Sequence, residues 1–165
     1  MSGKKSRNKG AAFEREIAAI FAEWSGGLEI CRTPLSGGWA RQNPAVSGDL
    51  VNITPDTVFP LHIECKKQEG WTLEAILQGH CAQFDSWWEQ TITTCPKDKL
   101  PLLVFSRNYH AIWCAGWQKH WDVSKLYNYC IIEEKVIIQF ENWLETYSLG
   151  GINIWLSNFS SITTT

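Results

Sequence analysis

The chain has 165 residues, a formal net charge of −2 at pH 7 and ten Trp. This length suits one domain, 1–165, with a sizeable buried core. No apolar run is long enough to span a membrane, and the polar, basic start is unlike a signal peptide, so we expect an intracellular protein. The six Cys are scattered without a CxxC pair, which favours buried free thiols over a zinc site or a disulfide framework.

Basic residues are concentrated in the first half of the chain. The first nine residues contain no acid, and we expect residues 1–9 to form a flexible basic tail. A locally basic face on a weakly acidic protein fits a DNA-binding surface that also holds a carboxylate site, although such a tail is as often only solvated. The basic residues of this half include Lys4, Lys5, Arg7, Lys9, Arg15, Arg32, Arg41, Lys66 and Lys67.

The first predicted element is a helix. Apolar residues at helical spacing predict that it runs from about Asn8 or Gly10 to Trp24, where two Gly end it. Glu14 lies at the edge of the apolar stripe. An acid there either points into a neighbouring cleft or, as helix position alone favours, stays in solvent.

A strand and a long loop follow this helix. Residues 28–33 form the predicted strand, and residues 34–47 form a Gly-containing loop with Trp39 and Arg41. A long polar loop ahead of a pair of acids is a candidate for a mobile or substrate-contacting element.

Two further short strands are expected to bring Asp49 and Glu64 together. Pro and Asp within 55–58 predict a turn, and the two acids lie at about the same distance from it. A hairpin centred there places the two carboxylates opposite each other, with Cβ atoms about 5 Å apart. In the second strand, alternation puts Glu64 and Lys66 on one face and Ile63 and Cys65 on the other.

The second half alternates strands and helices. Apolar patterns predict a helix over 72–89, a buried strand over 100–106 and, after a turn at 107–109, a strand over 111–115. Residues 131–140 read as partly β, 140–147 as partly helical, 152–159 as a last short strand, and 160–165 as a loose tail. This order indicates an α/β or α+β fold, in which helices pack on a mixed sheet.

The residues around Glu64 point to one kind of chemistry. Close carboxylates repel each other unless a cation lies between them, and oxygen ligands alone favour a hard cation such as Mg²⁺. The backbone carbonyl of Cys65 would lie beside that cation, and Lys66 would stand next to it. Such a centre hydrolyses phosphodiesters. Surface hairpins also carry such residues as solvated charges or ion pairs, so the pattern alone leaves both readings open.

Asp49 followed by Ile63-Glu64-Cys65-Lys66 resembles the signature of the PD-(D/E)XK nuclease superfamily. The first half is more similar to one branch, the archaeal-type Holliday junction resolvases, in which a basic tail leads into a KG…ER motif. Here that motif is KGAAFERE at residues 9–16, and a strand ending in Arg32 with a Ser-Gly loop follows it. The resemblance covers about residues 4–90. It implies a restriction-endonuclease-like catalytic core over 10–116, ordered helix-strand-strand-strand-helix-strand.

The resemblance implies a role for each member of an ordered set of residues. Asp49 and Glu64 resemble the metal ligands, and Lys66 resembles the catalytic lysine. Glu14 resembles the acid of the first helix that completes the metal site, which reverses the solvent-exposed reading of this residue. Ser36 resembles a loop serine that assists cleavage.

DNA is the partner that the resemblance implies. Phosphate contacts read no sequence, which suits recognition of a junction by its shape. A glutamine on the helix after the ExK strand is matched by Gln83, with Gln78 as a competing candidate. The expected DNA contacts are Lys4, Lys5, Arg7, Lys9, Arg15, Arg32, Arg41, Lys67 and Gln83.

Three features depart from the family pattern. No Pro precedes Asp49, the loop over 36–48 carries unusual residues such as Trp39, and the Trp-rich last part of the chain matches no part of the branch. In the relatives the second half builds the dimer interface, so we treat 117–165 as a divergent extension and a candidate dimerisation element. Its Trp residues are equally explained as core.

The function implied is a Mg²⁺-dependent endonuclease that resolves four-way DNA junctions. A homodimer would place two symmetric nicks, Mn²⁺ is expected to substitute for Mg²⁺, and neither a small-molecule cofactor nor a membrane is involved. Two alternatives stay open: a related repair or restriction-like nuclease that cuts linear or damaged duplex, and a DNA-binding module without chemistry. The divergent second half favours a phage-encoded protein that acts in the host cell.

Overall fold

The computed structural model describes residues 2–34 and 48–153, with the side chains of residues 7–34 and 48–153. The helices are α1 (Ser2–Trp24), α3 (Leu73–Leu77), α4 (Ala82–Thr94) and α5 (Phe140–Thr146), with short 3-10 turns η1 (Gln118–His120) and η2 (Val123–Lys125). The strands are β1 (Ile30–Arg32), β2 (Leu50–Asn52), β3 (Leu61–Lys67), β4 (Leu100–Ser106), β5 (Trp113–Trp117), β6 (Tyr129–Ile132) and β7 (Lys135–Gln139). Among the described residues, no helix has the length and apolar character needed to cross a membrane.

Strands β3 to β7 form one mixed sheet in the order β3-β4-β5-β7-β6. β3 and β4 run parallel, with Leu61 beside Leu100 and Lys67 beside Ser106. The remaining pairs in this sheet are antiparallel. The predicted mixed sheet with helices packed on it is confirmed, as is the hairpin that joins β4 to β5.

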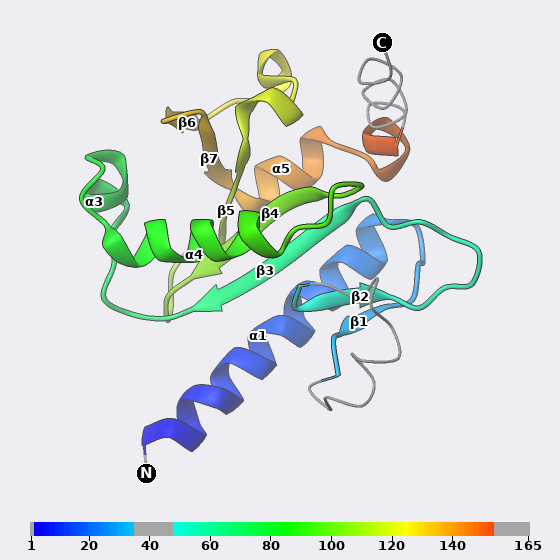
Figure 1. Cartoon of the computed structure of the whole chain (residues 1–165), viewed down its shortest axis with the longest axis horizontal. Coiled ribbons are helices and arrows are strands. Elements are labelled where there is room, and N and C mark those ends of the chain that lie inside the picture. Colours follow the sequence, from blue (N-terminus) through cyan, green and yellow to red (C-terminus); the bar gives the residue numbers. More distant parts are fainter. Residues whose placement is uncertain (1, 35–47, 154–165) are drawn as a thin grey trace.

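Helices cover both faces of this sheet and give the molecule three layers (Figure 1). Alternate residues of β4 point to opposite faces. Leu102 and Val104 pack in a core with residues of α1 and α5, whereas Leu103 and Phe105 pack in a second core with residues of α3 and α4. The sheet is therefore apolar on both sides, and its polar functional groups can lie only at an edge or an end.

The second half of the chain is part of the same sheet and the same cores. β6 and β7 extend the sheet beyond β5, and Trp121 and Trp143 are buried in the core that contains Phe13 and Phe21 of α1. Aromatic rings in this core meet mainly edge to face, as Trp121 does with Trp143 at 5.4 Å between centroids. These Trp residues therefore serve the core.

Helix α1 begins earlier than expected. It starts at Ser2 and not near Asn8 or Gly10, so residues 2–9 form its first turns and not a flexible tail. Lys and Arg are good helix formers, which explains why a basic segment continues a helix begun by the apolar stripe. The helix ends as predicted: the N–H groups of Gly26 and Gly27 bond back to Glu23 and Ala22, the pattern of a Schellman cap.

The single helix expected over 72–89 is two helices. Gly79, with φ of +69°, ends α3, and the N–H groups of Gly79 and His80 bond to the carbonyls of Ile76 and Ala75. This is again a Schellman cap. The chain then restarts as α4, which extends to Thr94. The apolar pattern runs through the break because both helices pack on the same face of the sheet.

The predicted hairpin between the second and third strands is not a regular ladder. β2 pairs with β1 in a separate two-stranded sheet, Ile30 beside Asn52, while β3 joins β4. The chain turns at Pro55 and Asp56 as expected. β2 ends at Asn52 and β3 begins at Leu61, so the connection is much longer than a tight turn and the two strands pair with different partners.

The strand expected over 152–159 is absent from the two residues of that range that the structure describes. Ile152 and Asn153 are helical, although 152–159 was expected to be a strand. Residues 154–165, which include the predicted loose tail, lie outside the described residues.

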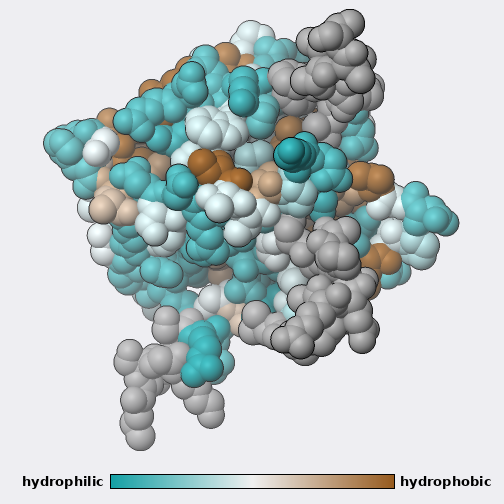
Figure 2. All heavy atoms as spheres, in the orientation of Figure 1, coloured by the Kyte–Doolittle hydropathy of each residue, from teal (hydrophilic) through white to brown (hydrophobic). Residues whose placement is uncertain are grey.

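The surface seen in the orientation of Figure 1 is mostly hydrophilic, and its apolar residues form small separate groups (Figure 2). Exposed apolar side chains include Ile53 and Val58, both in the loop between β2 and β3. Isolated apolar residues of this kind are ordinary for a protein surface.

Candidate active site

Strand β3 separates the core from the site. Leu61, Ile63 and Cys65 are buried in the core that α1 covers. The alternate residues His62, Glu64 and Lys66 point to the side of α4, where each meets a polar side chain of that helix or of its neighbour on the strand. The predicted division of this strand into two faces is confirmed.

A tight turn at Gly48 places Asp49 against the free edge of β3. The N–H of Asp49 donates to the Ile63 carbonyl at 2.8 Å, and Thr33 holds the turn by donating its N–H to the Asp49 carbonyl and its hydroxyl to the Gly48 carbonyl. Gly48 has φ of +84°, and a Cβ there would lie 2.7 Å from the Ile63 carbonyl oxygen. Only Gly lets the backbone approach so closely, so the Gly-Asp pair is needed to bring the acid to β3.

The Asp49 carboxylate is fixed by the backbone of β3. Its Oδ2 accepts the N–H of Cys65 at 2.8 Å. Since the N–H and C=O of one strand residue point to the same edge, the Cys65 carbonyl faces the Asp49 side as well, as its predicted role as a metal ligand requires. Burial raises the pKa of Asp49, while the Cys65 hydrogen bond opposes that rise and the Glu14 carboxylate adds to it.

Glu64 is an acid held in an unfavourable place. It is only 4% exposed, and its pKa is raised to about 7, first by burial and then by the Asp49 carboxylate, while Lys66 lowers it. Two desolvated carboxylates at one spot carry an electrostatic cost that a cation would relieve. The predicted proximity of Asp49 and Glu64 is therefore present, although a turn and not a hairpin ladder creates it.

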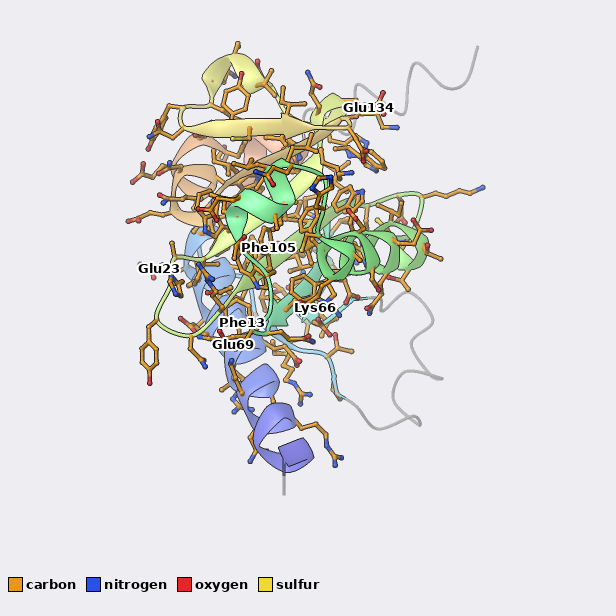
Figure 3. The ribbon with its side chains drawn as sticks, turned by 90° about the vertical axis from the view of Figure 1, so that its left-hand side faces the viewer. Phe13, Glu23, Lys66, Glu69, Phe105 and Glu134 are labelled. Atoms are coloured by element: carbon orange, nitrogen blue, oxygen red, sulfur yellow. The ribbon has the colours of Figure 1, made fainter. Side chains whose placement is uncertain are left out.

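Lys66 and Gln90 complete the polar face. Lys66 Nζ donates to Gln90 Oε1 at 3.0 Å and lies 3.4 Å from Glu64 Oε2, which also accepts from Gln90 Nε2 at 3.1 Å. The Gln90 amide therefore holds both Glu64 and Lys66. Figure 3 labels Lys66 near one end of the sheet.

Gln90 was not among the residues predicted for the site. The predicted Gln83 instead donates to Gln68 and to the Glu69 carbonyl, and Gln78 caps the C-terminus of α3. Helix α4 runs antiparallel to β3, so Gln90 lies two turns beyond Gln83, beside Glu64. The spacing of seven residues between two Gln on one helix face was the available signal.

His62 lies behind Glu64 and was also missed. Its Nε2 is 3.1 Å from the Thr94 hydroxyl and 3.8 Å from Glu64 Oε1. Burial lowers the pKa of His62 to about 4, so the ring is neutral near pH 7 and forms no ion pair with Glu64. Its position two residues before Glu64 on the strand was the sequence signal.

Glu14 reaches the site from α1, but its carboxylate is paired with a basic side chain of the protein. Its carboxylate forms an ion pair with the guanidinium of Arg32, at the end of β1. Glu14 is close enough to the other acids to raise the pKa of both Asp49 and Glu64. The side chain is therefore not a solvated flank carboxylate, and Arg32, expected to contact DNA, neutralises it here.

The donor set fits a hard divalent cation held by two carboxylates. Asp49 and Glu64, with the Cys65 carbonyl beside them, offer only oxygen, and Mg²⁺ is commonly bound by one or two carboxylates plus water and substrate phosphate. In the part of the chain that the structure describes, no group of three or more His, Cys, Asp or Glu side chains is gathered closely enough to hold a metal. Glu14 as a third ligand would first have to leave Arg32.

Two other predicted DNA contacts are paired with acids. Lys9 Nζ lies 2.9 Å from Glu69 Oε1, while Lys67 lies 3.7 Å from Glu16 and over the Phe13 ring. Arg7 and Arg15 are exposed. Ser36, Arg41 and the side chains of Lys4 and Lys5 lie outside the described residues.

Comparison with known proteins gives a family and a structural neighbour. The model of the family described as phage putative PDDEXK endonuclease matches residues 5–163, including the Trp-rich second half. No curated protein matches the chain. Among solved structures, the Holliday junction resolvase Hjc of Archaeoglobus fulgidus is similar at 14% identity and a TM-score of 0.33, over 86% of this chain and 93% of that one.

Proposed function

We propose that this chain, which belongs to the family of phage putative PDDEXK endonucleases, is a divalent-metal-dependent endodeoxyribonuclease that resolves four-way DNA junctions. Its membership confirms the predicted PD-(D/E)XK nuclease superfamily. The observation that carries the metal-dependent mechanism is the buried Glu64 carboxylate, whose pKa is raised to about 7 beside Asp49. Such a pair is costly without a cation and well placed to hold one.

Asp49, Glu64 and the Cys65 carbonyl would hold the cation, with Mg²⁺ as the natural ion and Mn²⁺ as a substitute. A bound divalent cation supplies water activation and neutralisation of the charge that develops on the phosphate. Asp49 is oriented for this by the Cys65 N–H and Glu64 by the Gln90 amide. Both carboxylates are thus positioned before substrate arrives, which is what electrostatic catalysis requires.

Lys66 would act on the reacting phosphate. Its ammonium group lies on the same face as Glu64, and Gln90 holds it through one hydrogen bond. A cation at that position orients the attacking water and stabilises the negative charge of the pentavalent phosphorus. Gln90 is a positioning residue in this scheme, because it touches both active groups.

Glu14 and Arg32 would respond to the cation or to DNA. A divalent ion held at Asp49 would attract the Glu14 carboxylate, and a DNA phosphate would compete with that carboxylate for the Arg32 guanidinium. Both changes separate the same ion pair. Ser36 stays a proposed residue that assists cleavage, and the basic residues Lys4, Lys5, Arg7, Arg15 and Arg41 stay proposed contacts of the DNA.

A junction as substrate is supported by the order of motifs from Lys9-Gly10 through Glu14, Arg32 and Asp49 to Lys66. Resolution needs two nicks related by symmetry, so we propose a homodimer as the active form. The family description favours action on DNA within a phage-infected cell. Cutting of linear or damaged duplex by the same centre is the competing function.

The test compares a four-way junction with a linear duplex of equal length, each incubated with the protein and Mg²⁺. The proposal expects paired nicks in the junction, little cutting of the duplex, activity with Mn²⁺ and none with EDTA. Asp49→Asn and Glu64→Gln should abolish cleavage and keep binding, whereas Glu89→Gln, an exposed acid on α4, should cut normally. Equal cutting of both substrates would favour the linear-duplex function, and normal cutting by Asp49→Asn would refute the site.

A further inference from the structure

The tip of the hairpin between β4 and β5 presents a fully exposed aromatic ring. Tyr109 has a relative exposure of 104%, the largest among the exposed apolar side chains of the described residues. Its backbone φ is +58°, a left-handed conformation that Asn, Asp and Gly adopt readily and a bulky side chain rarely does. The backbone conformation at this position is therefore less favourable for Tyr than it would be for Asn or Gly.

The backbone beneath Tyr109 is held from inside. The buried hydroxyl of Ser106 lies 3.1 to 3.2 Å from the carbonyl oxygens of Arg107, His110 and Ala111, so it fills the mouth of the turn. The N–H of His110 bonds to the Arg107 carbonyl across the turn. These bonds hold the backbone of the turn in one conformation, which lowers the entropy cost of a contact made there.

The residues beside the tip are anchored to the rest of the molecule. Arg107 donates to the Trp71 carbonyl and lies over the Trp71 ring at 5.4 Å. The N–H of Asn108 donates to Glu69 Oε1, which also accepts from Lys9 of α1 at 2.9 Å. The tip is thereby tied to the basic helix, and Lys9 neutralises the acid next to it.

The tip follows β4 directly, and the end of β4 lies beside Lys66. Lys66 pairs with Phe105 and Lys67 with Ser106, and Tyr109 is four residues after Phe105. With about 5 Å between neighbouring strands and at most about 3.5 Å per residue along the chain, the Cα of Tyr109 lies within about 19 Å of the Cα of Lys66. This is the length of about five to six stacked nucleotides of one DNA strand, so a strand held at Lys66 can reach Tyr109 within that number of nucleotides.

We propose that residues 107–110 form a contact for an unpaired or splayed nucleotide, with the Tyr109 ring stacked on its base. Stacking on an aromatic ring is the usual way in which proteins hold exposed bases. Lys9 is paired with Glu69, whereas Arg107 donates to the neutral Trp71 carbonyl, so Arg107 leaves one positive charge beside the tip for the DNA backbone. The inference rests on the proposed function, because it takes DNA as the substrate. It adds the structural feature of the DNA that the protein would recognise, which is an exposed base at a branch. A fully paired duplex offers no such base along its length.

The test uses the full-length protein and a four-way junction with 2-aminopurine at the branch, in EDTA so that binding is measured without cleavage. Tyr109→Asn removes the ring and suits the left-handed backbone, so this variant keeps the fold, and Tyr109→Phe keeps the ring. Tyr127→Asn is the matched control, since Tyr127 is 47% exposed and precedes β6 at the opposite edge of the sheet. A linear duplex with internal 2-aminopurine is the second probe.

We expect Tyr109→Asn to bind the junction about 5- to 140-fold more weakly than the native protein, the range that loss of one base–aromatic stack gives. The fluorescence change at the branch should disappear in Tyr109→Asn and persist in Tyr109→Phe. Tyr127→Asn should bind as the native protein does. Binding of the linear duplex should change less than twofold in all variants.

Other results would overturn the inference. Native affinity and fluorescence in Tyr109→Asn would remove the stacking role while leaving the nuclease function intact. Junction binding through Tyr109 without cleavage after Mg²⁺ is added would support the contact and refute the nuclease. If Tyr109→Asn converts a native dimer to monomers in sedimentation, the tip is a contact between copies of the chain and the DNA role is wrong.

Discussion

Replacing Glu64 by Gln should stabilise the protein while destroying its activity. The pKa of Glu64 is raised from 4.5 to about 7 in the folded state. At 1.36 kcal/mol per pKa unit, ionising this buried carboxylate lowers the free energy of unfolding by about 3 kcal/mol. A Gln side chain has a similar shape, stays neutral, and can accept the hydrogen bonds that Gln90 and Lys66 give to Oε2.

The sign of the pH dependence follows from the raised pKa. Below pH 4.5, Glu64 is protonated in both folded and unfolded states, and its burial costs little. The folded state loses stability as pH rises from about 4.5 to about 7, because over this range the unfolded state releases the Glu64 proton while the folded state keeps it; above about 7 the loss is complete. We therefore expect Glu64→Gln to exceed the native protein in unfolding free energy by about 1 kcal/mol or less at pH 5 and by about 3 kcal/mol at pH 8.

Urea unfolding at pH 5 and pH 8 in EDTA measures this difference. Mg²⁺ or Mn²⁺ at pH 8 should then reduce the difference in unfolding free energy between Glu64→Gln and the native protein. A cation that binds only the folded native site raises the unfolding free energy of the native protein by about 1.4 kcal/mol for each tenfold excess of its concentration over Kd. Glu64→Gln should gain little from the metal. Glu89→Gln, at an exposed position on α4, should shift stability by under about 0.5 kcal/mol. Two results would refute the reasoning: a Glu64→Gln variant that is no more stable than the native protein, or a difference in unfolding free energy between them that is the same at pH 5 and pH 8.

Three further changes test the rest of the site. Lys66→Met should lower the cleavage rate at least about 100-fold with junction affinity within about threefold in gel shifts; near-native cutting would remove Lys66 from the chemistry. Gln90→Ala should slow cleavage about 10- to 100-fold, with a larger effect on kcat than on KM. The control Gln83→Ala should cleave at a nearly native rate, and equal cleavage rates in the two variants would refute the positioning role of Gln90. Gly48→Ala should lower the free energy of unfolding by more than about 2 kcal/mol, because backbone strain adds to a clash with the Ile63 carbonyl. Gly79→Ala, also at positive φ but with open space around it, should lower it by about 1 kcal/mol. Thermal unfolding compares the two variants, and equal losses would mean that the clash is absent.

Strand β3 was predictable because its pattern is local. Alternation along Ile63 to Lys66 follows from strand geometry, and burial of the apolar set fixes which face meets the core. The approach of Asp49 to Glu64 was also expected. Its cause was not, because the close contact depends on Gly48 lying against the Ile63 carbonyl, and sequence spacing alone cannot show such a contact.

The residues supplied by α4 could not be placed from the sequence. Choosing Gln90 over Gln83 requires the direction and offset of α4 along β3, which are set by tertiary packing. The break at Gly79 carried a local signal, a Gly within an apolar helix pattern, but the pattern on either side continues without interruption. Helix α1 was misjudged at its start for the opposite reason, since its first turns lack the apolar stripe on which the prediction relied.

The division of β3 into two faces sets rules for how this strand can change in length. A one-residue insertion or deletion between Leu61 and Lys67 would turn the carboxylate into the core and Ile63 out of it, so the site and the fold would fail together. A change of two residues would keep both faces but move Glu64 away from Asp49 and Gln90. The loop before the strand carries neither constraint, and variation in length within this family should be concentrated at residues 53–58.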